Sequence, residues 1–106
     1  MHWIIEYIKE AENDLRELDH SQQIQVIKAI RKVSANPLPF TQGGCGKPLG
    51  HHLSSNLVGY LKIKLLKLGI RVIYRLVEEK GIMKIIIISV REDEKVYKLI
   101  QQRIKK

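Results

Sequence analysis

The sequence predicts an α+β domain whose elements follow one another in the order β-α-α-loop-β-β-β-α. Three observations lead to this prediction. Apolar residues recur with a helical period between 9 and 35, alternate with a period of two between 59 and 90, and return to a helical period from 93 onward. With 106 residues, the chain is long enough for one core and too short for two, so we expect a single domain over 1–106.

The first strand is predicted over 2–8, because the residues HWIIEYI are mostly β-branched or aromatic. The first helix is predicted over 9–18, where good helix formers separate an apolar face made of Ala11, Leu15 and Leu18. These two elements are short, so their stability must come from packing against the rest of the domain.

A second helix is expected to begin after the cap candidates Asp19 and Ser21 and to end at Asn36, because Pro37 disfavours helical geometry in the residue before it. Its period predicts a buried stripe made of Ile24, Ile27, Ile30 and Val33.

Residues 36–58 are rich in proline, glycine, serine and histidine, and they predict a long surface loop. A loop of this length in a compact domain is usually functional or mobile. Neither Cys45 nor the pair His51-His52 has companion residues at a metal-binding or catalytic spacing. We therefore interpret them as exposed loop residues and expect no metal ion or other cofactor.

The second half of the chain predicts three strands joined by tight turns, with sequences YLKIKLL, IRVIYRLV and IMKIIIISV. Within the second of them, Arg71 and Arg75 share one side with Ile73. The four isoleucines at 85–88 indicate a strand that is covered on both faces. A final helix starts at the cap candidate Asp93 and carries an apolar face of Val96, Leu99, Ile100 and Ile104.

Composition indicates a soluble protein of the cytoplasm. The hydrophobic fraction of 44% is that of a globular domain, and no apolar run approaches the roughly 20 residues that span a bilayer. The N-terminus shows no signal peptide pattern, and the single Cys45 has no partner for an internal disulfide.

Basic residues dominate the charge. Lys and Arg number 19 against 11 Asp and Glu, which gives a net charge of +8 and favours an anionic partner. No acidic residue occurs between 47 and 75, where the basic residues are Lys47, Lys62, Lys64, Lys67, Arg71 and Arg75. Of these, we predict Lys47, Lys67 and Arg75 as RNA-binding residues.

Lys62 and Lys64 lie on one face of a predicted strand, and a tight turn near 67–69 would bring Arg71 beside them. Arg91, after the last strand, and Tyr97, in the final helix, could border the same patch. Lysines alternating with apolar residues are also typical of a solvated strand face or of a protected sheet edge. Spacing alone leaves both interpretations open.

A cationic cluster with one phenol suits the cleavage of RNA without a metal ion, because the 2′-hydroxyl of RNA is an internal nucleophile. Clustered lysines depress one another's pKa, so one of them can accept a proton near neutral pH. Arginines stabilise the charge that develops on the phosphate oxygens, and an aromatic ring can stack on a displaced base.

The segment YLKIKLLKLGIRVIYRLVEEKGIMKIIIISVREDEKVYKLIQQRIKK resembles the RelE branch of the RelE/ParE superfamily of bacterial and archaeal toxins. The motifs that carry the resemblance are KIKL, G-x-R-V-I-Y-R and R-E-x-x-x-V-Y, while upstream KEAENDLREL, ANP and KPLG look like the helical hairpin and following loop of this family. The resemblance implies a mostly antiparallel four-stranded sheet, with an N-terminal helical hairpin packed on it and a C-terminal helix.

The resemblance also implies a function: the toxin of a type II toxin–antitoxin module, an endoribonuclease that cleaves messenger RNA in the ribosomal A site and leaves a 2′,3′-cyclic phosphate. The catalytic residues of the family pattern fall on Lys62, Lys64, Arg71, Arg91 and Tyr97. Lys64 would accept the proton of the 2′-hydroxyl, and Lys62 and Arg71 would stabilise the phosphate and the transition state. Arg91 would protonate the leaving group or stabilise its charge, and Tyr97 would stack on a base and orient it.

The partners implied are a cognate acidic antitoxin, messenger RNA on the ribosome, and operator DNA bound through the antitoxin. Two other functions remain open from the sequence. One is a ParE-like toxin that cleaves no RNA and binds a protein such as DNA gyrase. The other is a basic RNA-binding domain without activity, or a toxin that has lost its activity.

Overall fold

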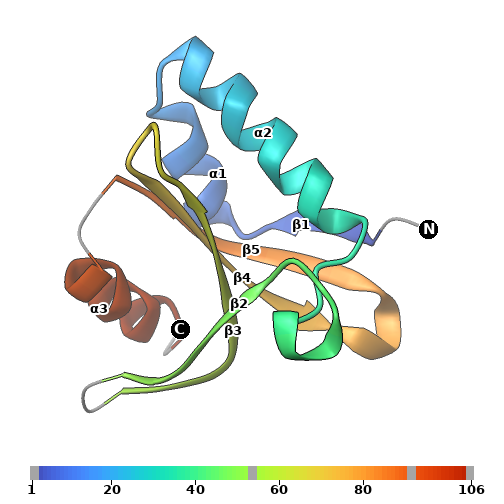
Figure 1. Cartoon of the computed structure of the whole chain (residues 1–106). Coiled ribbons are helices and arrows are strands. Elements are labelled where there is room, and N and C mark those ends of the chain that lie inside the picture. The colour runs from blue at the N-terminus through green and yellow to red at the C-terminus, as the bar shows by residue number, and fades with distance from the viewer. Residues whose placement is uncertain (1–2, 53–54, 91–92, 105–106) are drawn as a thin grey trace.

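The computed structural model describes residues 3–52, 55–90 and 93–104. One face of a β-sheet is covered by two helices from the N-terminal third of the chain, and the C-terminal helix lies against the other face (Figure 1). The elements are β1 (Ile4–Tyr7), α1 (Lys9–Arg16), α2 (His20–Ser34), β2 (Lys47–His52), β3 (Ser55–Leu65), β4 (Ile70–Val77), β5 (Ile82–Ser89) and α3 (Asp93–Ile104), with 3₁₀ turns at Phe40–Gln42 and Glu78–Lys80.

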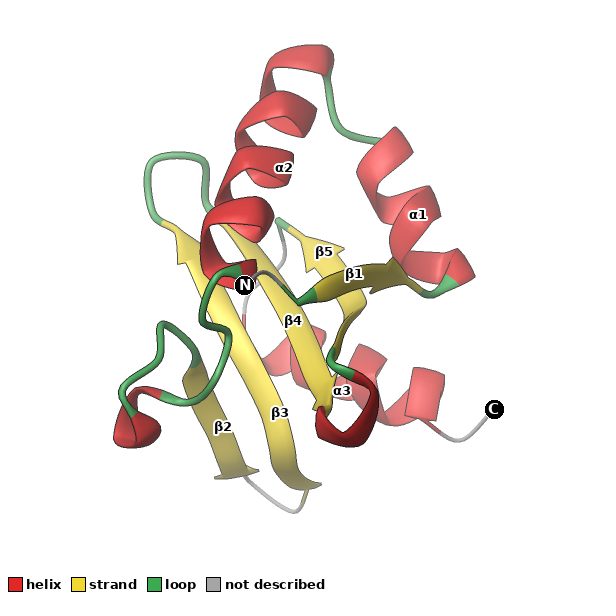
Figure 2. Ribbon diagram, turned by 90° about the vertical axis from the view of Figure 1, so that its right-hand side faces the viewer, coloured by secondary structure: helices red, strands yellow, loops and turns green. Residues whose placement is uncertain are grey.

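The sheet has the strand order β1-β5-β4-β3-β2 over the described residues (Figure 2). β1 runs parallel to β5, and the remaining pairs are antiparallel. The predicted α+β class and the mostly antiparallel sheet are therefore confirmed. The predicted number of strands is wrong, because the described residues form five strands rather than four.

The additional strand is β2, which lies inside the predicted loop 36–58. Proline and glycine are depleted in strands, so Pro48 and Gly50 concealed it. β2 is an edge strand that pairs only with β3 in the described sheet, and a proline is tolerated at such an edge. His51 and His52 consequently belong to a strand and not to a loop, although their side chains lie outside the described residues.

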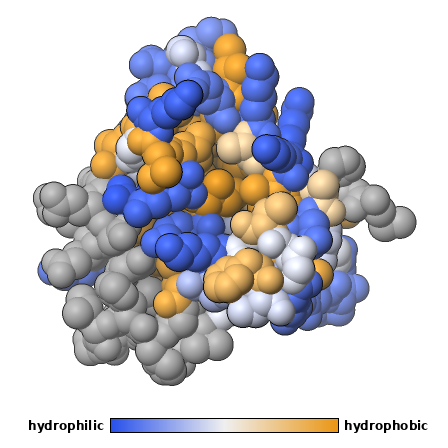
Figure 3. Space-filling model, in the orientation of Figure 1, coloured by the Kyte–Doolittle hydropathy of each residue, from blue (hydrophilic) through white to orange (hydrophobic). Residues whose placement is uncertain are grey.

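Both N-terminal helices form as predicted, with one error in the buried stripe. Asp19 caps α2 through a capping box, in which its side chain accepts from the backbone N–H of Gln22 at 2.8 Å. Ile24 was expected in the core but is 41% exposed, while Val26 is fully buried. The buried face of α2 is thus made by Val26, Ile30 and Val33, which follow one another at helical spacing. In the view of Figure 3, hydrophilic residues line the outer edge of the helical layer, with hydrophobic residues among them. In the described part of the chain, no helix combines the length and apolarity required to cross a membrane.

Two apolar clusters cover the two faces of the sheet. The larger lies under α1 and α2 and includes Val72, Tyr74 and Ile85, whereas the smaller joins Val96 and Ile100 of α3 to the other face. The two clusters together contain all four predicted interior isoleucines, Ile85 and Ile88 in the first, Ile86 and Ile87 in the second.

The distribution of these isoleucines reflects an irregularity in β5. Ile73 pairs with Ile87 and Tyr74 with Ile85, so Ile86 is an extra residue on β5. Beyond this bulge, the side chains of β5 exchange faces relative to a regular strand. Ser89 therefore reaches the face that carries α3, whereas uninterrupted alternation from Ile85 would have placed it under α1 and α2.

Candidate active site

Three polar residues form a row across the sheet on the face that carries α3. Lys64 of β3 stands opposite Arg71 of β4, and Arg71 stands opposite Ser89 of β5. Directly opposed residues on antiparallel strands share a face and have Cβ atoms about 5 Å apart. The predicted approach of Arg71 to the lysine pair is thus confirmed by the register. The turn after Leu65 makes it possible, with Gly69 in the left-handed conformation at φ 66°.

A second row lies one pleat further along the same face. Lys62 of β3 stands between Lys47 of β2 and Ile73 of β4. Lys62 is 8% exposed, whereas Lys64 and Lys47 are exposed. The two lysines of the strand are therefore unlike each other. A fully solvated strand face, which the sequence left open, does not describe Lys62.

The two remaining predicted RNA-binding residues lie at opposite ends of this face. Lys67 is exposed in the turn between β3 and β4, next to the end of the hairpin that carries Lys64 and Arg71. Arg75 is exposed and lies four residues after Arg71 on β4, a distance of roughly 13 Å by strand geometry. Lys67 thus extends the row that contains Lys64 and Arg71, which we call the cationic row. Arg75 is a separate positive charge on the same face.

The last two predicted site residues are less defined. Arg91 lies outside the described residues. Tyr97 belongs to α3, directly after Val96, which is fully buried against the sheet, but its side chain lies outside what the structure describes. The helix that carries Tyr97 therefore packs on the same sheet face as Lys62, Lys64 and Arg71.

Sequence analysis missed Ser89 as a neighbour of this site. Ser89 is 8% exposed, and it also lines a pocket of about 220 Å³ together with Asp14 of α1, Glu17 directly after this helix, and Leu99 and Arg103 of α3. The pocket adjoins the end of the row that contains Arg71. The signal that would have located Ser89 is the β-bulge at Ile86, which the pattern of four successive isoleucines does not reveal.

A buried tyrosine on the opposite face fastens the segment that leads into β2. The hydroxyl of Tyr74 donates to the carbonyl oxygen of Pro37 at 2.8 Å, and burial raises the pKa of this phenol, with a further increase from nearby Cys45. Gly46 packs so closely here that a Cβ would lie 2.2 Å from the Tyr74 hydroxyl oxygen. This packing delivers β2, and with it Lys47, to its place beside Lys62.

Burial also raises the pKa of Tyr7, an effect that the nearby charge of Arg31 partly offsets. Tyr7 packs against the larger apolar cluster, away from the cationic face. Within the ranges 3–52, 55–90 and 93–104, no three His, Cys, Asp or Glu residues are grouped so as to hold a metal ion.

The arrangement can hold an anion at a defined place. Arg71 is half-buried and offers several N–H donors, while Lys64 projects beside it from the neighbouring strand. A single phosphate group could contact both side chains. The charge of Lys62 would then lie two residues away from Lys64 on the same face of β3.

No family model matches the chain, and no curated protein matches it. Solved structures do resemble it. A doubly substituted mutant of the E. coli toxin RelE in the free state is 23% identical over 98% of this chain and 99% of that chain, with a TM-score of 0.74. The intact E. coli RelBE toxin–antitoxin complex contains a chain that is 22% identical, with 85% of this chain and 98% of that one covered and a TM-score of 0.68.

A third structure, the RelBE2 toxin–antitoxin complex of Mycobacterium tuberculosis, contains a chain that is 23% identical. The comparison covers 86% of this chain and 100% of that one, with a TM-score of 0.67. The expected fold is thereby confirmed independently of the motifs that first indicated it. The chain has the fold of the RelE toxins.

Proposed function

We propose that this protein is the toxin of a type II toxin–antitoxin pair and cleaves messenger RNA on the ribosome without a metal ion. The observation that supports the proposal best is the pairing of Lys64 with Arg71, on a sheet face that also carries Lys62, in a chain with the fold of RelE toxins. A site of this composition has cations for a phosphodiester but no carboxylate or imidazole in its rows to serve as the usual base.

The proposed reaction begins when Lys64, in its neutral form, accepts the proton of the ribose 2′-hydroxyl. The 2′-oxygen attacks the adjacent phosphorus, and the bond from phosphorus to the 5′-oxygen of the next nucleotide breaks. The leaving 5′-oxygen takes up one proton, so the products are a 2′,3′-cyclic phosphate and a 5′-hydroxyl. We assign Arg91 to the leaving 5′-oxygen, as its proton donor or as a positive charge that stabilises it. We assign Tyr97 to stacking on a displaced base.

The different exposure of the two lysines supports different roles for them. Lys64 is exposed and can reach a bound nucleotide, which suits the proton acceptor. Lys62 is 8% exposed, so its position is fixed by the surrounding sheet, and it suits electrostatic stabilisation of the transition state together with Arg71. Preorganised charges of this kind are effective because they need no rearrangement during the reaction.

The proposed partners follow from charge. A net charge of +8 suits both an RNA substrate and an acidic antitoxin that neutralises the cationic face. We assign Lys47, Lys67 and Arg75 to contacts with RNA, since they are exposed around the central row. Operator DNA would be bound through the antitoxin, and the proposed substrate places the protein in the cytoplasm.

The test is induced expression in bacteria, followed by mapping of messenger RNA ends by primer extension. We expect growth arrest and cuts in phase with codons for the wild-type protein, and neither for Arg71→Ala. Arg31→Ala serves as the matched control, because Arg31 is exposed on α2, on the opposite side of the sheet.

Full toxicity of a folded Arg71→Ala variant would contradict the assignment of the site. Intact transcripts accompanied by DNA damage would contradict cleavage of RNA altogether, and would indicate a ParE-like action on a protein target.

A further inference from the structure

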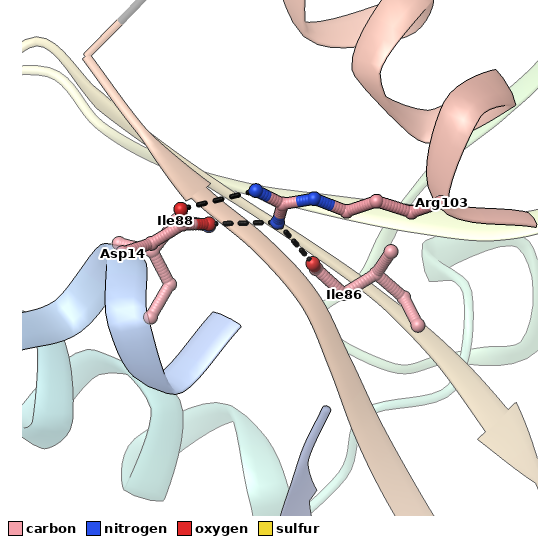
Figure 4. Close-up of polar contacts among 4 residues, drawn as sticks. All are labelled: Asp14, Ile86, Ile88 and Arg103. Carbon is pink, nitrogen blue, oxygen red and sulfur yellow. Dashed lines mark hydrogen bonds and ion pairs between the residues drawn. The ribbon is translucent and has the colours of Figure 1, made fainter. Parts of the chain in front are cut away.

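The side chain of Arg103 connects α3 to the opposite side of the sheet. Its guanidinium donates to both carboxylate oxygens of Asp14 on α1, at 2.8 and 3.1 Å, and to the carbonyl oxygen of Ile86 at 2.7 Å (Figure 4). Asp14 in turn accepts from the backbone N–H of Ile88 at 3.0 Å. One ion pair therefore joins α1, β5 and α3, and we call Asp14 and Arg103 the clasp.

The clasp lies where β5 has lost its neighbouring strand. β1 pairs with β5 only as far as Ile85, so the following backbone groups of β5 need other partners. Arg103 supplies a donor to Ile86 and Asp14 an acceptor to Ile88. The clasp thus supplies two hydrogen-bond partners to β5 at the bulge that turns Ser89 toward Arg71.

The surroundings make this ion pair more costly to break than the exposed pair of Arg16 and Glu12. The Arg103 and Asp14 side chains are 13% and 18% exposed, whereas Arg16 and Glu12 of the α1 surface pair are 74% and 52% exposed. A pair that is withdrawn from water, bidentate and supported by further hydrogen bonds is costly to break from one side, because the remaining charge is left buried.

Few other described contacts fasten α3. Val96 and Ile100 are the fully buried residues of this helix among those described, and they pack on the smaller apolar cluster. The larger cluster lies on the other side of the sheet and contains no described residue of α3. Loss of the clasp should therefore loosen α3 while the sheet and the N-terminal helices stay folded.

We propose that Arg103 and Asp14 are positioning residues, which fix α3, the helix that carries Tyr97, on the sheet face of the cationic row. The part that concerns Tyr97 rests on the proposed function. The part that concerns the helix does not, and it is measured separately.

Hydrogen exchange of the full-length protein tests how α3 is fastened. In Arg103→Ala, we expect the amides of α3 to exchange about 10- to 100-fold faster than in the wild type, while those of β3 and β4 stay protected. Asp14→Asn should give a similar but smaller effect, because its amide oxygen can still accept from Ile88 but carries no charge. Arg16→Ala, the matched control on the exposed pair, should leave α3 unchanged.

Single-turnover cleavage of messenger RNA on ribosomes tests the link to Tyr97. Arg103→Ala should reduce the rate about 10-fold or more in the wild-type background, and Arg103→Lys should restore part of it. In a Tyr97→Ala background, the same Arg103→Ala substitution should change the rate less than about 2-fold, because the residue that it positions is already absent.

Each outcome decides one part. Unchanged exchange of α3 in Arg103→Ala would overturn the clasp as the fastening of this helix. If Arg103→Ala reduces the rate equally in the presence and absence of the Tyr97 side chain, the positioning role of Arg103 is overturned. If the wild-type protein cleaves no RNA at all, the proposed function fails, and hydrogen exchange still decides whether the clasp fastens α3.

Discussion

Replacing Tyr74 with phenylalanine should destabilise the fold through a single lost hydrogen bond. The ring is fully buried in β4, and its hydroxyl donates to the carbonyl oxygen of Pro37 at 2.8 Å. Phenylalanine keeps the ring and leaves this carbonyl without its donor in a buried position. Leaving such a group unsatisfied costs about 1–3 kcal/mol, and each kcal/mol lowers the Tm of a domain of this size by about 4–8 °C. We therefore expect the Tm to fall by about 4–24 °C.

The same substitution should alter the dependence of stability on pH. Burial raises the pKa of the Tyr74 phenol above its ordinary value of 10.0, so above this pH the unfolded chain loses the proton while the folded chain retains it. The contribution of the phenol to the free energy of unfolding is complete below pH 10 and is lost as the pH rises. Phenylalanine does not titrate and so loses no stability in this way. The difference in stability between the two proteins should therefore shrink as the pH rises above 10.

Thermal melts at neutral pH and denaturant titrations at alkaline pH measure both effects. Tyr60→Phe is the matched control, because Tyr60 is a partly exposed tyrosine on the adjacent strand β3, and its effect should stay within about 0.5 kcal/mol. A Tyr74→Phe variant that melts with the wild type and shows the same alkaline pH profile would refute the argument that this hydroxyl fastens the segment before β2.

Three further substitutions test other parts of the structure. Asp19→Ala should cost about 1 kcal/mol in unfolding experiments, because it removes the side-chain cap on the N–H of Gln22, and no change would contradict the capping box. Val26→Ala should cost about 1.5–3 kcal/mol while Ile24→Ala costs under about 1 kcal/mol, since only Val26 is fully buried, and the reverse order would contradict the assigned helix face. Arg71→Lys should lower single-turnover cleavage about 10-fold or more, because lysine lacks the planar fork of donors, and an unchanged rate would show that charge alone suffices.

Local patterns predicted most of the helices and strands. The periods of the segments KEAENDLR and IRVIYRLV are set by which side of each element meets the core, and this information lies within a few neighbouring residues. The same reasoning failed for Ile24 and Val26, because two positions on adjacent sides of a helix are both apolar and only the packing of α2 on the sheet chooses between them. It failed for β2 because pairing with β3 overrides the low strand propensity of Pro48 and Gly50.

The candidate site was predicted where it depends on one hairpin and missed where it depends on distant segments. Lys62, Lys64 and Arg71 are separated by a single turn, so alternation and turn length sufficed to bring them together. Ser89 required the bulge in β5, and the contact of Arg103 with Asp14 spans 89 positions of the sequence. No periodicity in the sequence predicts a contact between residues so far apart, because the contact forms only when α1 and α3 pack around β5.

The roles of Arg91 and Tyr97 remain predictions from the resemblance to RelE toxins. Arg91 lies outside the described residues, and for Tyr97 the structure gives the helix but not the side chain. Their assignment is testable by cleavage assays with Arg91→Ala and Tyr97→Ala. The cationic row itself depends on described strands and does not rely on either residue.

Cleavage of a messenger RNA with one modified nucleotide tests most directly whether the 2′-hydroxyl is the nucleophile at this site. Ribosomes are programmed with the natural RNA, or with one that carries a 2′-deoxynucleotide immediately 5′ of the bond that the protein cuts. We expect cleavage of the natural RNA to a 2′,3′-cyclic phosphate, in the presence of a chelator of free divalent ions that leaves the ribosomes intact, and no cleavage at that bond in the modified RNA. Equal cleavage of the two RNAs would contradict the mechanism assigned to Lys62, Lys64 and Arg71.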